Sequence, residues 1–100
     1  MNFIYEQPLL AYMNKKGKST IVVEEVTSNN SDFEITELHV HLIDEKSAEI
    51  FKKKKGYYTV RSEHGEVLFP PFQLKLEDTI TFYLKSFLGI KYLGYKGIQK

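Results

Sequence analysis

Short runs of β-branched and aromatic residues, separated by turn-forming residues, constrain the fold of this chain more than any other feature. Tyr and Phe number seven each among the 100 residues, and Val, Ile and Thr gather in short segments. These side chains pack well on a pleated surface, so the segments predict strands. The expected strands are residues 20–26, 33–43, 57–62, 66–69, 72–76 and 80–84, with turns at 28–31, 63–65 and 77–78.

The segment 33–43 changes its pattern partway along. Phe33 and Ile35 share one face, whereas Leu38, Val40 and Leu42 occupy the other. Side chains alternate along a strand, so either a bulge near residues 36–37 resets the register or the strand is buried on both faces.

Residues 44–55 predict one short α-helix. Asp44 suits the N-cap, and Gly56 suits the position just after the helix. Glu45 and Glu49 complement the positive, N-terminal end of the helix dipole, and the lysines at 52–55 complement its negative, C-terminal end. We interpret the lysine run as a helix C-terminus rather than as a binding patch. Residues 8–13 fit either a further strand or one helical turn, because the periodicity of so few residues does not distinguish a strand from a helix.

Six to seven strands with one short helix indicate a small antiparallel sandwich or a partly open barrel. The length and the uniform composition predict a single domain covering residues 1–100. If residues 9–13 form a strand, the helix follows the third strand, as in an OB-fold. OB-folds often bind single-stranded nucleic acid.

Composition excludes several classes of chemistry. The chain has no cysteine, which removes thiolate metal sites, redox chemistry and cysteine nucleophiles. The N-terminus does not resemble a signal peptide, and no segment approaches the roughly 18 apolar residues of a membrane span. We therefore expect a cytoplasmic protein, or a component of a particle assembled in the cytoplasm.

Two histidines, His39 and His41, lie two positions apart on an expected strand, so both point to one face as metal-binding pairs do. His64, on an expected turn, is a third candidate ligand. The alternative is a solvent-exposed polar face formed by Glu37, His39 and His41. No carboxylate at a fixed spacing completes a ligand set.

No catalytic arrangement is evident. The serines lack a G-x-S-x-G context, and the glycines are isolated rather than gathered in a phosphate-binding loop. We expect neither catalytic residues nor a cofactor.

The C-terminal fifth of the chain differs from the rest in charge. Residues 79–100 contain four lysines and no Asp or Glu, a formal charge of +4, whereas residues 1–78 carry −3. Aromatic residues alternate with these lysines, a mixture found where bases stack or a partner is bound. The candidate binding residues are Phe87, Lys91, Tyr92, Tyr95 and Lys96. The alternative is that Phe82, Leu84, Phe87 and Leu88 are core residues and that Tyr92 and Tyr95 complete the last strand.

Three functions follow as hypotheses. The first is a non-enzymatic binding or assembly protein acting through protein–protein contacts or self-association, such as an accessory protein of a bacterium, phage or mobile element. The second is an OB-like protein that binds single-stranded nucleic acid. Sequence-specific DNA reading is disfavoured, because Arg61 is the only arginine. The third is a small metal-dependent enzyme using His39, His41 and His64.

Overall fold

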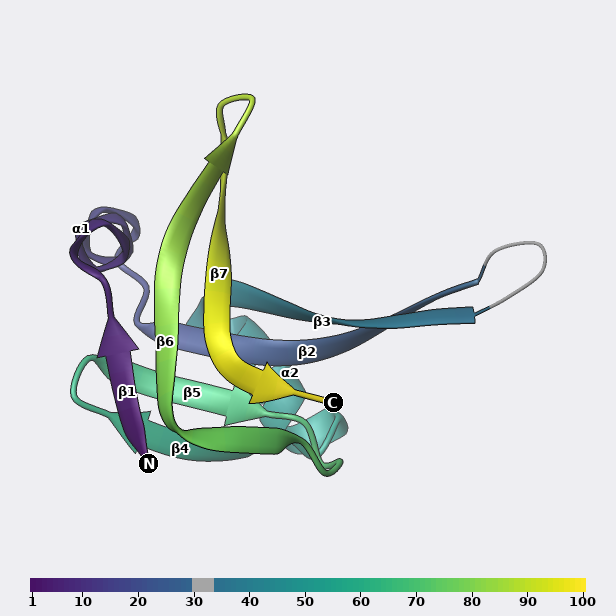
Figure 1. The fold of residues 1–100 in the computed structure, drawn as a ribbon. Helices are drawn as coiled ribbons and strands as arrows, with labels where there is room; N and C mark the ends of the chain where they lie inside the picture. The colour runs from purple at the N-terminus through teal and green to yellow at the C-terminus, as the bar shows by residue number, and fades with distance from the viewer. Residues whose placement is uncertain (30–33) are drawn as a thin grey trace.

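Seven strands and two helices make up the described part of the chain, which is residues 1–29 and 34–100 of a computed structural model. In chain order they are β1 (Asn2–Tyr5), α1 (Gln7–Lys16), β2 (Thr20–Asn29), β3 (Glu34–Ile43), α2 (Glu45–Lys54), β4 (Tyr58–Ser62), β5 (Gly65–Phe69), β6 (Lys75–Phe87) and β7 (Ile90–Gln99). One sheet has the order β1-β6-β7 and the other has the order β3-β2-β5-β4. In Figure 1 the long hairpin of β6 and β7 runs across β2 and β5.

The main core lies between the two sheets. Phe69 of β5 and Phe82 of β6 are fully buried there, and the ring of Phe3 stacks on both, with centroid distances of 6.5 and 6.1 Å. Ile21, Val67 and Ile80 complete the centre of this cluster. The hydrophobic effect of bringing these side chains together holds the sheets against each other.

The central strands β2 and β5 are covered on both faces. Ile21 and Val23 face the main core, whereas Val22 between them packs with Leu68, Ala48 and Tyr57 in a second cluster under α2. Neighbouring residues of a strand point to opposite faces. The continuous apolar run of β2 is therefore explained by a sheet on one side and a helix on the other.

The predicted helix over residues 44–55 is confirmed, as is a mainly β fold of six to seven strands, although the described ranges hold a second helix, α1, that was not predicted as such. The Asp44 side chain accepts a hydrogen bond from the Ser47 amide at 2.8 Å, and Gly56 has φ +71° just after the helix. The β4–β5 hairpin closes through residues 63 and 64, with Ser62 paired with Gly65. Two of the strand pairings, β1 with β6 and β2 with β5, are parallel, so the sheets are mixed rather than purely antiparallel.

The predicted hairpin between residues 72–76 and 80–84 is wrong. Residues 75–87 form one strand, because Leu76 and Thr81 both pair with β7 and the chain does not reverse between them. The register shifts at this point, so residues 77–78 lie at an irregularity within β6 rather than at a turn.

A bulge near residues 36–37 is also not found, since the pairing of β2 with β3 runs without interruption from Thr20↔Ile43 to Asn29↔Glu34. Leu38, Val40 and Leu42 pack toward the main core. Phe33 and part of the expected turn at 28–31 lie outside the described residues.

The N-terminal segment resolves the choice left open for residues 8–13. They belong to the helix α1, which carries Pro8 in its first turn and buries Leu9 and Met13. The Glu6 amide donates to the Phe82 carbonyl at 3.1 Å and so joins the start of this helix to β6. No helix in the described ranges has the length and apolar character needed to cross a membrane.

We predict that the N-cap of α2 makes stability depend on pH in the acid range. The hydrogen bond from the Ser47 amide holds the pKa of Asp44 below its ordinary value of 3.8. Because the folded-state pKa is the lower one, this stabilisation is present above the unfolded-state pKa and is lost as the pH falls through the folded-state pKa. Asp44→Ala should therefore lower Tm at neutral pH, and the difference from wild type should shrink near about pH 3.

Thermal unfolding followed by circular dichroism at both pH values measures this difference. Asp44→Asn is the matched control, because it keeps an acceptor for the Ser47 amide without titrating. A Tm difference for Asp44→Ala that is the same in acid as at neutral pH would contradict the prediction.

Candidate functional site

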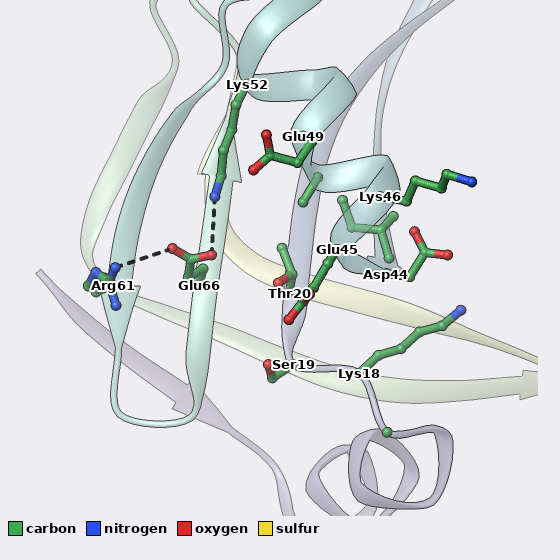
Figure 2. Close-up of a pocket in the computed structure, with 13 residues that line it drawn as sticks. Lys18, Ser19, Thr20, Asp44, Glu45, Lys46, Glu49, Lys52, Arg61 and Glu66 are labelled. Atoms are coloured by element: carbon green, nitrogen blue, oxygen red, sulfur yellow. Dashed lines mark hydrogen bonds and ion pairs between the residues drawn. The ribbon is translucent and has the colours of Figure 1, made fainter.

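A hollow lies where α2 begins, beside the start of β2 and the β4–β5 hairpin. It has a volume of about 820 Å³ and a mostly polar lining. Glu66 lies 3.3 Å from the Lys52 ammonium and 3.9 Å from the Arg61 guanidinium, as Figure 2 shows. The Asp44 carboxylate is engaged by the helix that it caps. Glu66 and Asp44 are therefore engaged within the chain, and Lys18, Glu45 and Lys46 also line the hollow.

The predicted metal ligands are brought together only in part. The rings of His39 and His41 lie side by side on β3, with centroids 5.9 Å apart. Glu37 Oε2 lies 3.1 Å from His39 Nε2, and Glu24 Oε2 lies 3.6 Å from His41 Nε2. Each imidazole therefore has its own carboxylate neighbour on a partly exposed face.

His64 lies elsewhere, on the turn between β4 and β5. Its ring makes an edge contact with Tyr5, at a centroid distance of 5.1 Å. The Tyr5 hydroxyl is 2.8 Å from Ser62 Oγ, and burial raises the pKa of this tyrosine. Across the described ranges, no three His, Asp or Glu side chains are grouped closely enough to hold a metal ion.

The C-terminal candidates gather on the β6–β7 hairpin, whose tip projects beyond the rest of the molecule in Figure 1. We call Phe87, Leu88, Gly89 and Ile90 the hairpin tip. The side chains of Phe87, Leu88 and Ile90 are 64, 86 and 68% exposed. The alternative assignment to the core is therefore wrong for Phe87 and Leu88. It is confirmed for Phe82 and Leu84, and Tyr92 and Tyr95 do lie in the last strand, β7.

The turn at the hairpin tip has an unfavourable residue in it. Phe87 pairs with Ile90, so the loop consists of Leu88 and Gly89, with φ values of +51° and +80°. Two positive φ values identify a type I′ turn, for which Asn, Asp and Gly are the favoured residues. A leucine in this conformation costs about 1–2 kcal/mol. The leucine side chain is exposed, so its own packing does not offset that cost.

A basic and aromatic face lies below the tip. The Tyr83 ring covers Gly94, where an added Cβ would lie 2.4 Å from Tyr83 Cε2, so glycine makes room for the ring. The Lys85 ammonium lies 5.7 Å from the Tyr83 ring centroid and 5.8 Å from that of Tyr92, and the Lys96 ammonium lies 5.6 Å from Tyr83. These cation–π contacts place two positive charges on one face of the hairpin.

The five predicted binding residues divide between the two faces of the hairpin. Phe87, Tyr92 and Lys96 share the face of Tyr83, because directly paired residues point the same way. Lys91 and Tyr95 lie on the other. The Lys91 ammonium lies 5.8 Å from the Tyr12 ring of α1, and the Tyr95 hydroxyl donates to the Leu38 carbonyl at 3.4 Å.

Several residues of this site were not singled out from the sequence as binding residues. Leu88 was assigned only to a possible core, and Ile90, Tyr83 and Gly94 carried no functional assignment. Side chains alternate between the two faces of a strand along residues 81–87 and 90–96. Once the two strands are paired, this alternation places Tyr83, Lys85, Tyr92 and Lys96 on one face.

Comparison with known proteins adds no identification. No protein-family model, no curated protein and no solved structure matches this chain.

We predict that Leu88→Asn stabilises the protein. Asparagine adopts positive φ more readily than leucine, so the substitution should raise the free energy of unfolding by about 1 kcal/mol. Ile90→Asn is the matched control. It makes the same polar change two residues away, at a position without a positive φ.

Chemical denaturation of the wild type and of both variants measures this effect. The Ile90→Asn variant should be no more stable than the wild type. Equal stabilisation by both variants would show that polarity rather than backbone strain is responsible, and would contradict the prediction.

Proposed function

We propose that this chain is a non-enzymatic binding or assembly protein that docks its hairpin tip into the surface of another protein, a second copy of this chain included. The observation that carries the proposal is Leu88, a large apolar side chain that is 86% exposed at a position of positive φ. Strained residues that a fold does not itself require are characteristic of functional positions.

The energy available at the hairpin tip supports this function. Fully burying a side chain such as Phe, Leu or Ile is worth about 1.5–3 kcal/mol. Phe87, Leu88 and Ile90 are presented together on a two-residue turn, which limits the conformational entropy lost on binding. Such a compact apolar anchor is typical of the energetic centre of a protein–protein interface.

The surroundings of the hairpin tip indicate the chemistry of the partner. Lys85 and Lys91 flank the tip on the two faces of the hairpin, and residues 79–100 contain no acidic residue. The complementary surface is an apolar pocket with an acidic rim, since matched charges favour encounter and orientation. We place this activity in a cytoplasmic accessory protein of a bacterium, phage or mobile element, or in a particle assembled in the cytoplasm.

We predict that p-benzoylphenylalanine at position 88 forms a discrete photo-cross-linked adduct, because the hairpin tip is the part that enters the partner. The measurement uses purified protein and lysate of the source cells, with adducts identified by mass spectrometry. A dimer of this chain in the purified sample would identify self-association, and a heteromeric adduct in lysate would identify another partner.

The matched control places the same photoreactive residue at position 72. Phe72 is another exposed apolar side chain, at 51%, and it lies outside the hairpin tip. Combining the position 88 probe with Lys85→Glu and Lys91→Glu should strongly reduce the adduct. Adducts of equal yield from positions 72 and 88, or none from position 88, would refute the proposed docking site.

Single-stranded nucleic acid is the second candidate partner, favoured by the four aromatic and lysine side chains on one face of the hairpin (Tyr83, Lys85, Tyr92 and Lys96). Lysines could neutralise phosphates while the rings stack on bases. In the present arrangement the ammonium groups already lie against the rings, and this favours the protein partner.

A titration with a labelled oligonucleotide at two salt concentrations distinguishes these candidates. Phosphate contacts are strongest at low salt, so a nucleic-acid-binding protein must bind under that condition. We expect no binding at low salt. Binding that is lost in a Lys85→Ala, Lys96→Ala variant would instead favour the nucleic-acid function.

A further inference from the structure

A groove separates the free edges of the two sheets. β3 and β7 are edge strands, one in each sheet. Between them lies a hollow of about 600 Å³, which we call the β3–β7 groove. Its lining residues are Leu38, His39, Val40, His41, Tyr83, Lys85, Tyr92, Leu93, Gly94 and Tyr95.

Two hydrogen bonds establish which backbone groups of β3 face the groove. The Tyr95 hydroxyl donates to the Leu38 carbonyl at 3.4 Å, and the Lys100 ammonium donates to the Thr36 carbonyl. Both carbonyls therefore point away from β2. Backbone groups of a strand alternate in direction with a period of two, and the pairing of β2 with β3 is uninterrupted. The N–H and C=O of Val40 consequently point toward the groove as well.

Val40 is the exceptional residue on this edge, because it is only 5% exposed. Within the described ranges, no strand pairs with this side of β3, and no side chain forms a hydrogen bond with the Val40 backbone. Backbone N–H and C=O groups are nearly always paired, with protein, water or a ligand. An added strand is the partner that satisfies both the N–H and the C=O at once.

The charge of the groove selects the type of strand. Its lining contains the Lys85 ammonium and no Asp or Glu, and the two histidines in the lining each lie beside a carboxylate of their own, Glu37 and Glu24. Lys100 adds a further ammonium at the Thr36 end of the same edge. An acidic segment complements this lining, and Tyr83 and Tyr92 supply contact surface for its apolar side chains.

We infer that the β3–β7 groove binds an extended acidic peptide segment of a partner protein, which adds to the edge of β3 as a further strand. The segment pairs its backbone with Leu38 and Val40, and its amide replaces the Tyr95 hydroxyl on the Leu38 carbonyl. This site shares Lys85 with the surroundings of the hairpin tip but uses none of the tip residues, so it does not depend on the function proposed for the tip.

The test uses a fluorescein-labelled, capped peptide of about ten residues in which valine alternates with glutamate, a length that matches an ordinary strand. Fluorescence anisotropy at low salt measures binding, and amide hydrogen exchange by NMR reports where the peptide pairs. We expect the peptide to slow exchange of the Val40 and Leu38 amides by about tenfold or more. The Leu88 amide should exchange as before.

Two control peptides isolate the two components of recognition. A peptide with the same side chains but N-methyl groups on alternate amides cannot pair and should not bind. A peptide with lysine in place of glutamate retains its backbone groups but should bind at least about tenfold more weakly.

Variants test the same site from the side of the protein. Val40→Pro removes the outward N–H without removing a bond to β2, and should abolish binding. Since this variant could fail to fold, Lys85→Glu provides a second test and should weaken binding, whereas Lys46→Glu on α2 should not. Leu88→Asn should bind as the wild type does, so failure of the hairpin-tip proposal would leave this result unchanged. No binding at low salt, or binding without slower exchange at Val40, would overturn the inference.

Discussion

The packing of one sheet across the other is the constraint on which the rest of the structure depends. Phe69 and Phe82 come from different sheets, are both fully buried, and are bridged by the ring of Phe3. Once this cluster forms, β2 and β5 have one face covered, and α2 covers the other through Val22 and Leu68. The edges β3 and β7 are left at the margin of the core, and so they hold the groove between the sheets.

Local signals predicted the parts of the fold whose determinants are local. Asp44 and Gly56 marked the two ends of α2, and both act there as expected. The pairing of β1 with β6 could not be predicted, because four residues carry little periodicity and their partners lie far along the chain. Residues 77–78 were misinterpreted as a turn for a related reason. Polar residues at a strand irregularity resemble a turn until the partner strand is known.

The candidate site shows the same difference between features with local determinants and features that depend on strand pairing. The absence of acidic residues over 79–100 drew attention to the hairpin. The division of the five candidates between its two faces could not be predicted, because it depends on the register of β6 with β7. Leu88 escaped notice because leucine is not a turn-forming residue. Only the backbone angles show that it occupies a position normally taken by asparagine or glycine.

The parallel pairing of β1 with β6 also bears on how the molecule reaches its native state. Asn2 pairs with Thr79 and Tyr5 with Phe82, so each pair is separated by 77 positions in the chain. Contacts between residues so far apart in the chain cost much conformational entropy of loop closure before they contribute any stabilisation. Chains dominated by such contacts fold slowly. During synthesis, β2, β3 and β5 can associate while Phe3 and the inner face of β5 still lack their covering sheet. In this interval the nascent chain exposes both an apolar face and an unpaired strand edge, the two features that make a folding chain prone to aggregation.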